Sequence, residues 1–430
     1  MASKSFQSPK GMPDILPQDQ AYWEKVRKIV KDLSGIYGFS RIDTPIVEDT
    51  ALFERGTGEA TEVVSKQMYS FKTKGGYNLT LRPEGTPSIA RAYIQHGMIN
   101  LPHPLKLYYI GPFFRHEQPQ SGRFRQFHQF GFEIIGEKSP VLDAQIIQIF
   151  LTICENLGLK NLSIHLNSIG CPSCRPEYRK VLKDWLGAKS KKLCLDCRVR
   201  IKKNPLRVLD CKDEKCKQMI NGAPNIIDYL CSDCKTHFKK LLEFLDELEI
   251  PYFISPFLVR GLDYYTKTVF EVFSDAGEED PVALGGGGRY DVLISDLGGK
   301  DTSAVGAAFG IERLVNLMKK QQVKLSQRPA PKVFLVHLGD LGKVKSLKLF
   351  NDLYRAGIIA GEAFGKDSIK SQFKIADRIG AKFSLILGQQ EALDNAVILR
   401  DMESGVQEVI PLPNIAVEVK KRLRKVVIKK

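Results

Sequence analysis

The sequence contains two long strand-like segments that are joined by a polar loop. Residues 106–117 and 127–136 are rich in aromatic and β-branched side chains, which favour strands. The loop between them contains Pro119 and Gly122, residue types that favour a change of chain direction. These features predict a long antiparallel hairpin, and this hairpin constrains the fold more than any other segment.

The side chains of this hairpin suit a ligand that carries both a nucleotide and an amine. Side chains alternate between the faces of a strand, so each strand presents four residues on one face: Gly111, Phe113, Arg115 and Glu117 on the first, and Phe127, Gln129, Gly131 and Glu133 on the second. If these faces coincide, Phe127 can stack on a base and Arg115 can bind a phosphate. Gln129 and Glu133 suit a substrate amine. A core strand with charged residues at its solvated ends is the alternative.

The loop of the hairpin and the segment before it add candidate contacts. Arg123 and Arg125 in the loop are suited to phosphates. In LRPEGT, residues 81–86, a proline and a glycine predict a turn that presents Glu84 and Thr86 as hydrogen-bonding groups. An ordinary loop is the alternative for this motif.

A third motif, LVRGLDYYT at residues 258–266, contains charge and two tyrosines inside an apolar stretch. A buried arginine is unfavourable unless it meets an anion. Either Asp263 neutralises Arg260 or a ligand phosphate does, and the pattern favours neither.

Two glycine-containing motifs follow. GGGGRYD, residues 285–291, does not have the spacing of a dinucleotide-binding fingerprint. We predict a turn at residues 285–288, either close to a ligand or as a flexible hairpin. In AVGAAFGIERL, residues 304–314, small residues lead into a helix that begins near Glu312. Arg313 can then contact an anion at the helix N-terminus, or the motif is simply a glycine-packed helix start.

Eight of the nine cysteines lie within residues 171–245, which we interpret as an inserted module. They form four close pairs: Cys171 and Cys174, Cys194 and Cys197, Cys211 and Cys216, and Cys231 and Cys234. The gap from Cys174 to Cys194 fits a C-x2-C-x15–20-C-x2-C zinc pattern. Any two pairs can form one tetrahedral site, and four pairs can form two. We predict structural Zn²⁺, with reduced, partly buried thiols as the alternative, and Cys154 as a core residue.

Length and charge limit the class of protein. A chain of 430 residues exceeds one compact domain. The net charge of +15 favours a polyanionic partner such as nucleic acid. The chain has no apolar run of about 18 residues that could span a membrane. Residues 1–16 lack the apolar centre of a secretory signal, so we predict a cytoplasmic protein with no membrane partner and with reduced cysteines.

The remaining segments predict helices and a second domain. We expect helices at residues 22–36 and 141–157 and strands within residues 253–273. After a polar linker at residues 319–331, strands and helices alternate. The expected strands are 333–337, 358–364, 383–387, 397–401 and 406–410, and the expected helices are 341–356, 368–379 and the basic C-terminal end. This order predicts a small α/β domain.

Together the motifs resemble those of the histidyl-tRNA synthetase family, which are class II aminoacyl-tRNA synthetases, along essentially the whole chain. FRHE and GRFRQF, within residues 114–127, are similar to motif 2 of that class, and GIERL at residues 310–314 to motif 3. YGFSRIDTPIVED at residues 37–49, with Pro45, is similar to motif 1, the dimer element. LVRGLDYYT and GGGGRYD resemble the two histidine signatures of the family.

The resemblance implies an α+β fold: an antiparallel-sheet class II synthetase catalytic core with a Cys-rich insertion and a C-terminal α/β anticodon-binding domain. The implied boundaries are residues 1–170 and 246–325 for the core, 171–245 for the insertion and 329–430 for the anticodon-binding domain. The implied reaction activates L-histidine with ATP, as a substrate, to histidyl-adenylate and pyrophosphate, and then transfers histidine to the 3′ end of tRNA(His). The implied enzyme is a homodimer that needs Mg²⁺.

The family's functional residues carry over onto matching positions. The implied histidine-binding residues are Glu84, Gly85, Thr86, Arg115, Gln129, Glu133, Arg260, Tyr264 and Tyr265. The implied ATP-binding residues are Arg115, Glu117, Arg123, Phe127 and Arg313. Arg260 and Arg115 are the implied catalytic residues, as fixed cations at the α-phosphate. The family often has arginine where Gln118 stands, which leaves open how the tRNA acceptor end is recognised.

Two other classes of protein remain as alternatives. One is a regulatory paralogue that controls ATP phosphoribosyltransferase, which usually lacks the C-terminal domain and intact ATP motifs. The other is a basic RNA-binding pseudoenzyme, against which the intact Arg115, Arg260 and Arg313 argue.

Overall fold

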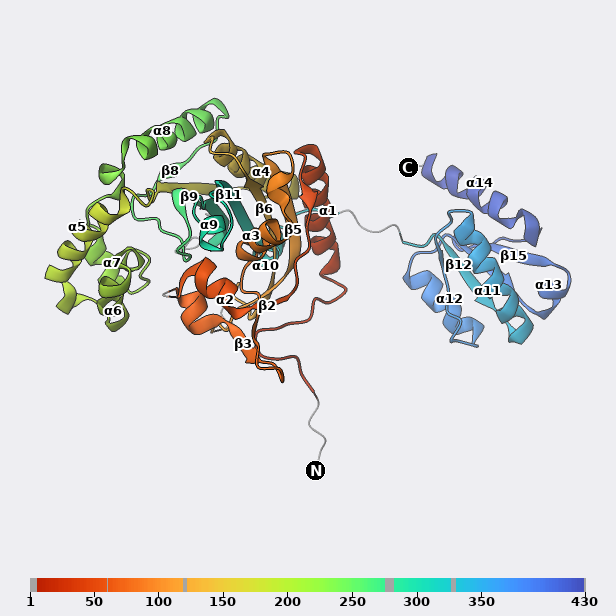
Figure 1. The fold of residues 1–430 in the computed structure, drawn as a ribbon. Coiled ribbons are helices and arrows are strands. Elements are labelled where there is room, and N and C mark those ends of the chain that lie inside the picture. The colour runs from red at the N-terminus through yellow and green to blue at the C-terminus, as the bar shows by residue number, and fades with distance from the viewer. Residues whose placement is uncertain (1–5, 60, 119–121, 275–281, 326–329, 429–430) are drawn as a thin grey trace. The chain divides into compact units, whose positions relative to one another are not determined.

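The computed structural model describes residues 6–59, 61–118, 122–274, 282–325 and 330–428. The chain forms two compact units, one up to Leu325 and one from Ser326 onward. Figure 1 shows the elements of each unit. No helix among the described residues is long and apolar enough to cross a membrane.

An eight-stranded sheet in the order β1-β5-β6-β11-β10-β9-β7-β8 forms the centre of the first unit. Its strands are β1 (Ser40–Arg41), β5 (Leu105–Phe114), β6 (Gln126–Ile135), β7 (Leu162–Ser168), β8 (Phe253–Ile254), β9 (Thr266–Ser274), β10 (Val282–Arg289) and β11 (Ala304–Gly310). Neighbouring strands are antiparallel except at the two edges, β1-β5 and β7-β8. The predicted hairpin is confirmed, because β5 and β6 pair along their whole length.

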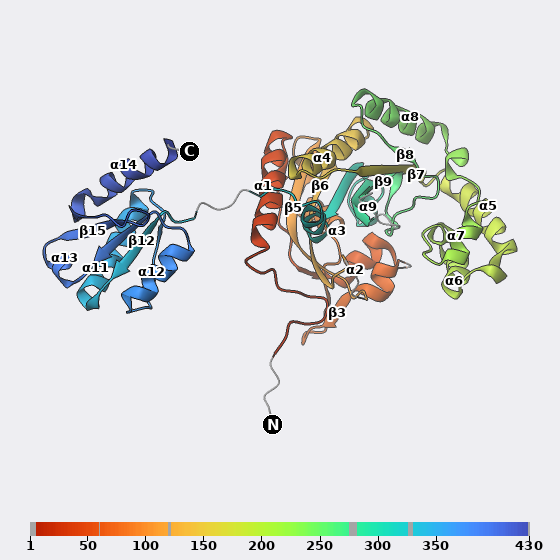
Figure 2. The same ribbon diagram turned by 180° about the vertical axis from the view of Figure 1, so that it is seen from behind.

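Three helices pack against one face of this sheet and against one another: α1 (Gln20–Ile36), α4 (Val141–Leu157) and α10 (Ile311–Lys320). They bury a core in which the rings of Phe150 and Phe309 stack with centroids 4.2 Å apart. Cys154 lies fully buried in this core, as predicted. This face is therefore closed by apolar packing. Figure 2, turned by 180° from Figure 1, shows α1 and α4 on it.

The opposite face is covered by shorter elements and remains open in part. They are α2 (Thr50–Phe53), α3 (Thr86–Gln95), α9 (Leu293–Asp296), the single-turn segments η1 (Glu54–Gly58), η2 (Val63–Gln67) and η3 (Met98–Asn100), and a three-stranded sheet of β2 (Val47–Asp49), β4 (Asn78–Leu81) and β3 (Tyr69–Lys72). Ile89 and Tyr93 of α3 pack into a second apolar core on this face. The LRPEGT motif connects β4 to α3.

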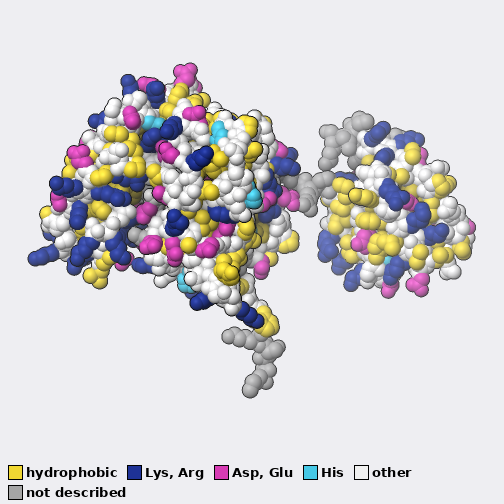
Figure 3. Space-filling view, in the orientation of Figure 1, with side chains coloured by type: hydrophobic (Ala, Val, Ile, Leu, Met, Phe, Trp, Pro, Cys, Tyr) yellow, Lys and Arg dark blue, Asp and Glu magenta, His cyan; other side chains and the backbone are white. Residues whose placement is uncertain are grey.

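The Cys-rich module is helical. It comprises α5 (Arg175–Ala188), η4 (Ser190–Lys192), α6 (Leu195–Lys203), η5 (Pro205–Val208), α7 (Glu214–Ile220), η6 (Ile226–Tyr229) and α8 (Ser232–Glu247). It lies between β7 and β8 in the chain, and Lys and Arg side chains gather over its surface (Figure 3).

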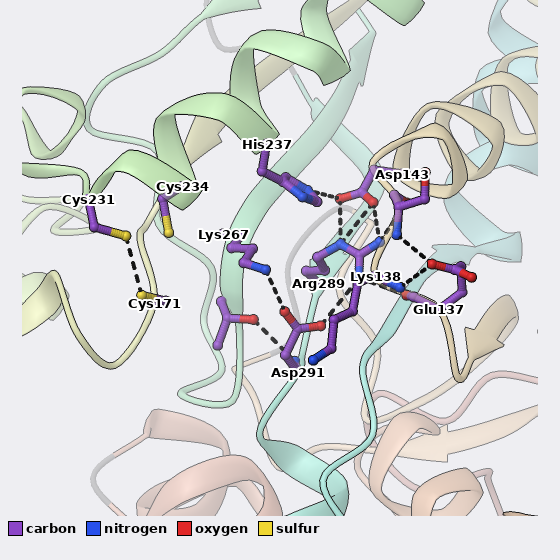
Figure 4. A network of polar contacts seen from close by, with 12 residues as sticks. Glu137, Lys138, Asp143, Cys171, Cys231, Cys234, His237, Lys267, Arg289 and Asp291 are labelled. Atoms are coloured by element: carbon purple, nitrogen blue, oxygen red, sulfur yellow. Dashed lines mark hydrogen bonds and ion pairs between the residues drawn. The ribbon is translucent and has the colours of Figure 1, made fainter.

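A buried ion-pair network joins this module to the core (Figure 4). Arg289 at the end of β10 and Asp143 of α4 are both fully buried and are 2.7 Å apart. His237 of α8 lies 3.2 Å from the same carboxylate. Burial by itself would raise the pKa of Asp143, but the charge of Arg289 and the hydrogen bond with His237 hold this pKa below its usual value. Cys231 and Cys234 lie at the start of α8, so this network attaches the last helix of the module to the core.

The predicted turn at residues 285–288 is wrong, because these glycines lie inside strand β10. They are needed there because the neighbouring strands approach very closely. A Cβ atom on Gly287 would lie 2.1 Å from the carbonyl oxygen of Gly306, and one on Gly286 would lie 2.3 Å from that of Phe270. A Cβ on Gly286 would also lie 3.0 Å from a guanidinium nitrogen of Arg260.

Two strand predictions were too long. Within residues 253–273 only β8 and part of β9 are strands, and the segment between them is irregular. Residues 358–364 contain only the two-residue strand β13 (Ala360–Gly361).

The second unit has a five-stranded sheet in the order β13-β12-β14-β15-β16. Besides β13, its elements in chain order are β12 (Val333–His337), α11 (Gly339–Arg355), α12 (Ile369–Arg378), β14 (Phe383–Leu387), α13 (Gln389–Leu393), β15 (Ala396–Asp401), β16 (Gln407–Pro411), η7 (Leu412–Asn414) and α14 (Ile415–Ile428). The first three strands are parallel and the last two antiparallel. Separate apolar clusters on α11 with α14 and on α12 cover the sheet, as predicted for a small α/β domain.

Candidate active site

A pocket of about 200 Å³ opens over the middle of the eight-stranded sheet. It is lined by all five residues predicted to bind ATP: Arg115, Glu117, Arg123, Phe127 and Arg313. Gln129 and Arg260, which were predicted to bind histidine, line it as well. Glu271 of β9 and Gly285 of β10 complete the same wall. Segments that are far apart in the sequence therefore converge on one site.

The register of the hairpin confirms that its two functional faces coincide. Phe127 pairs with Phe113, and Gln129 pairs with Gly111. Paired residues project to the same face. Phe127 and Gln129 therefore lie on the floor of the pocket. Gly111 leaves room for Arg82, because a Cβ there would lie 2.4 Å from a guanidinium nitrogen of that residue.

Two arginines in the pocket make no ion pair with any residue that the structure describes. The Nε of Arg115 donates to the carbonyl oxygen of Pro83 at 2.9 Å, and its guanidinium lies 5.5 Å from the ring centre of Phe127. Arg313 donates to the carbonyl oxygens of Gly122, at 3.3 Å, and Ala283. Burial, followed by the charge of Arg123, lowers the pKa of Arg313. Such crowded, partly buried cations suit a polyanionic ligand.

Arg260 has a carboxylate partner that was not predicted from the sequence. Its guanidinium pairs with Glu271 and not with Asp263, so neutralisation by Asp263, one of the two alternatives, is wrong. Burial alone would lower the pKa of Arg260, but the charge of Glu271 raises it. Asp263 instead pairs with Arg207 of the module, at 2.7 Å.

Next to this wall lie two buried carboxylates that have only neutral partners among the described residues. Glu84 accepts hydrogen bonds from Thr57 at 2.5 Å and Tyr264 at 2.7 Å. Burial raises the pKa of this carboxyl. It therefore lies in a place where a positively charged or N–H-bearing ligand is favoured.

The second buried carboxylate is Glu133 in the middle of β6. It accepts hydrogen bonds from Thr86 at 2.8 Å and Tyr290 at 2.6 Å. Burial raises the pKa of Glu133 to about 7. This carboxyl therefore changes charge near neutral pH, unlike an exposed glutamate.

Tyrosines enclose this inner part of the site. Tyr264 and Tyr265 are both buried, and their ring centres lie 4.6 Å apart. Tyr109, opposite Gly131 on the hairpin, has a buried hydroxyl group that has no hydrogen-bond partner among the described residues. A Cβ on Gly85 would lie 2.5 Å from the Tyr109 ring. Gly85 therefore makes room for Tyr109.

Four residues of the site were not predicted from the sequence: Thr57, Tyr109, Glu271 and Tyr290. Tyr109 could have been found from the strand alternation, because it lies on the same face as Gly111. Tyr290 belongs to the GGGGRYD motif, but the predicted turn gave no reason to aim it at Glu133. Thr57 and Glu271 have no signal in the local sequence.

Two other predicted positions lie apart from the pocket wall. Arg125 donates to the carbonyl oxygen of Glu117 at 3.1 Å, which makes it part of the support of the loop. Gln118 is exposed.

The eight cysteines of the module form two groups, each with all four sulfur atoms within 4.8 Å of one another. The first group is Cys171, Cys174, Cys231 and Cys234, and the second is Cys194, Cys197, Cys211 and Cys216. The first pair in sequence therefore joins the fourth, and the second joins the third. The pattern based on the gap from Cys174 to Cys194 paired the wrong cysteines. Four converging sulfur atoms are a typical structural Zn²⁺ donor set.

Known proteins resemble this chain over almost its full length. The sequence model of histidyl-tRNA synthetase matches residues 11–191 and 204–314, and that of an anticodon-binding domain matches residues 332–422. The histidine–tRNA ligase of Dehalococcoides mccartyi is 46% identical over 97% of this chain and 100% of its own length. That of Caldicellulosiruptor bescii is 44% identical over 98% of this chain and 100% of its own length.

A solved structure agrees with these matches. The crystal structure of S. aureus histidyl-tRNA synthetase aligns with a TM-score of 0.80 and 36% identity, and the alignment covers 96% of this chain and 99% of that one. The predicted α+β fold with an antiparallel core sheet and a C-terminal anticodon-binding domain is thereby confirmed. The chain belongs to the histidyl-tRNA synthetase family, whose members are aminoacyl-tRNA synthetases and ligases.

Proposed function

We propose that this chain activates L-histidine with ATP and transfers the histidyl group to the 3′ end of tRNA(His). One observation carries this proposal: a wall of arginines lies next to two buried carboxylates that accept hydrogen bonds only from neutral groups among the described residues. The arginines suit the phosphates of ATP, and the carboxylates suit the nitrogen atoms of histidine.

The inner part of the site is proposed to bind histidine. Glu84 and Glu133 accept hydrogen bonds from the ammonium group and the imidazole, and Gln129 and Thr86 add neutral contacts. Tyr264 and Tyr265 enclose the side chain. An apolar wall with a few fixed polar groups gives strong discrimination against amino acids that cannot satisfy those groups.

The arginine wall is proposed to bind ATP. Phe127 stacks on adenine, Arg115 contacts the α-phosphate, and Arg123 and Arg313 hold the outer phosphates. Glu117, which lies 3.4 Å from Arg123, orients that side chain. The polar contacts of Arg115 and Arg313 to carbonyl oxygens support this assignment, because they leave both positive charges uncompensated.

In the first step, a carboxylate oxygen of histidine attacks the α-phosphorus of ATP. A new P–O bond forms, and the bond to pyrophosphate breaks. Negative charge increases on the α-phosphate oxygens, and Arg260 and Arg115 stabilise it as fixed cations. In the second step, the terminal ribose hydroxyl of tRNA attacks the acyl carbon, and AMP leaves.

Two metals belong to the proposal. Mg²⁺ shields the phosphates when ATP is bound, and the carboxylates of Glu117 and Glu271 in the same pocket are the kind of oxygen ligand it prefers. Structural Zn²⁺ binds at the two cysteine groups.

The partners of the proposal are tRNA(His) and a second copy of this chain. Basic side chains on the module and on α14 support contact with RNA phosphates. Ile46, Val47 and Phe71 are exposed apolar residues in and beside the small sheet that contains motif 1, which supports a homodimer at that sheet. Nine cysteines without disulfide bonds support a cytoplasmic location.

The regulatory paralogue and the RNA-binding pseudoenzyme are less well supported. Both lack a reason to keep Arg115, Arg260 and Arg313 in one pocket, as they are here. The match to an anticodon-binding domain further favours a tRNA ligase over a regulator.

Replacing Arg260 tests its role in the transition state. Arg260→Ala should lower kcat of histidine-dependent ATP–pyrophosphate exchange by about a hundredfold or more, because one fixed charge at the reacting centre is lost. The Kd of histidine, measured by calorimetry, should change far less. Arg260→Lys keeps the charge and should recover part of the rate. Equal losses in kcat and histidine affinity would contradict the role.

Replacing Glu133 tests histidine binding and its pH dependence. Glu133→Gln should weaken histidine binding at pH 8 by about tenfold, because a charged hydrogen bond is lost, and should leave the Kd of ATP unchanged. As pH falls through about 7, Glu133 takes up a proton, so the advantage of the wild-type protein should shrink. Comparing both proteins at each pH cancels the titration of free histidine. A constant ratio of the two Kd values from pH 6 to pH 8 would contradict this account.

Removing the second unit tests its proposed role in tRNA recognition. A chain that ends at Leu325 keeps the compact first unit and should retain histidine-dependent pyrophosphate exchange. Its aminoacylation of tRNA(His) should fall by at least about tenfold, because phosphate contacts are lost. Full charging activity by the shortened chain would show that the second unit does not bind tRNA.

A further inference from the structure

The second cysteine group lies beside the active site. A cavity of about 590 Å³ is lined both by Arg115, Arg123 and Arg313 and by Cys194 and Cys211. The module therefore forms part of the wall around the arginines, and its local order can affect them.

The chain between the two cysteine pairs of this group reaches the loop that carries Arg260. Arg207 belongs to η5, which lies between Cys197 and Cys211, and its side chain is buried. It donates to the carboxylate of Asp263 at 2.7 Å and 3.1 Å and to the backbone carbonyl of Arg260 at 3.0 Å. Asn204 donates to the same carboxylate at 3.0 Å. One module segment thus holds both ends of the Arg260–Asp263 turn.

Asp263 also contacts the core of the first unit. Its backbone N–H donates to the carbonyl oxygen of Thr57 at 3.1 Å. The hydroxyl group of Thr57 in turn donates to Glu84. A continuous set of hydrogen bonds therefore runs from η5 of the module to the buried carboxylate of the inner site.

A residue next to the first cysteine group contacts the other end of the same loop. Arg175 follows Cys174 directly at the start of α5. Its guanidinium donates to the backbone carbonyl of Tyr265 at 2.6 Å. Residues 260–265 are therefore held between two arginines, and each arginine is next to or between cysteines of one group.

The geometry of the second group fits a bound metal ion. The backbone N–H of Cys194 points to the sulfur of Cys216 at 3.3 Å, and that of Cys197 points to the sulfur of Cys194 at 3.4 Å. Such N–H groups stabilise thiolates, the form that binds metal. Only one short 3-10 helix lies between Cys197 and Cys211 after α6, so cross-linking by a metal would strongly restrict η5.

We propose that Zn²⁺ at the two cysteine groups clamps residues 260–265 through Arg207 and Arg175, and so positions Arg260 for catalysis. Arg207 and Arg175 are positioning residues, because they act through the loop and do not touch the reacting atoms. This inference rests on the proposed function, since it assigns the clamp to the residue that activates histidine. It goes beyond a structural metal, because loss of Zn²⁺ would reduce catalysis before it unfolds the core.

The first arm of the test measures the metal itself. Elemental analysis of the purified, reduced full-length protein should find two zinc ions per chain. Replacement with Co²⁺ should produce the absorption bands of tetrahedral cobalt–thiolate centres, and Cys211→Ser should lose one of the two ions. Less than one zinc ion per chain in reduced, zinc-loaded protein would overturn the proposal, whatever the activity.

The second arm separates positioning from metal binding. Arg207→Ala should keep two zinc ions and a cooperative unfolding transition of the first unit well above the assay temperature. It should lower kcat of histidine-dependent exchange by about tenfold or more, because small displacements of a catalytic group are costly. The KM of ATP should change less than about threefold. Arg179→Ala, an exposed arginine on α5, is the matched control and should keep wild-type kcat. Unchanged kcat in Arg207→Ala would overturn the proposal.

The third arm asks whether metal and Arg207 act in one chain of contacts. If they do, Arg207→Ala combined with Cys211→Ser should be no slower than the slower single variant. Multiplicative losses would overturn the coupling. If Cys211→Ser does not fold, a zinc-selective chelator with excess Mg²⁺ replaces it, and Arg207→Ala should then lose less activity than the wild-type protein does. If the wild-type protein showed no histidine-dependent exchange, the proposed function would be refuted. The zinc content could still be measured, because that measurement does not depend on activity.

Discussion

Glu133 lies fully buried in the middle of a sheet, and the active site depends on how its carboxyl group is satisfied. Burying a carboxylate without partners costs several kcal/mol. Here the hydroxyl groups of Thr86 and Tyr290 supply hydrogen bonds, and Gly306 on the paired strand leaves space, because a Cβ there would lie 1.6 Å from the carboxylate. Glu133 is therefore satisfied only when three features are formed together: the strand register, the turn before α3 and the end of β10.

The same requirement explains the run of glycines in β10. These residues let three strands approach closely, and Gly286 also leaves room for the guanidinium of Arg260. Arg260 is then held by Glu271 from the next strand. The guanidinium of Arg260 is thus held by β9, and the carboxylate of Glu133 lies on β6 of the same sheet. Anchoring to one sheet preorganises both groups.

Much of this could be predicted from sequence because the signals are local. Alternation along two strands predicted the shared face of Phe127, Gln129 and Glu133, and apolar spacing predicted α1 and α4. The glycine run was misread as a turn, because nothing in its own sequence shows that neighbouring strands will crowd it. The ion-pair partners Glu271 of Arg260 and Arg207 of Asp263 were not predicted either, since they depend on long-range contacts. The four cysteine pairs were visible, but which pairs combine is set by the path of the helices between them.

The central claim is that the two buried carboxylates select histidine for activation at the arginine wall. The most direct measurement is ATP–pyrophosphate exchange by the full-length protein, with each of the twenty amino acids tested separately. The account predicts exchange with histidine that exceeds every other amino acid by at least about a thousandfold, as expected for a site whose buried polar groups only one ligand satisfies. Comparable exchange with another amino acid, or none with histidine, would contradict it.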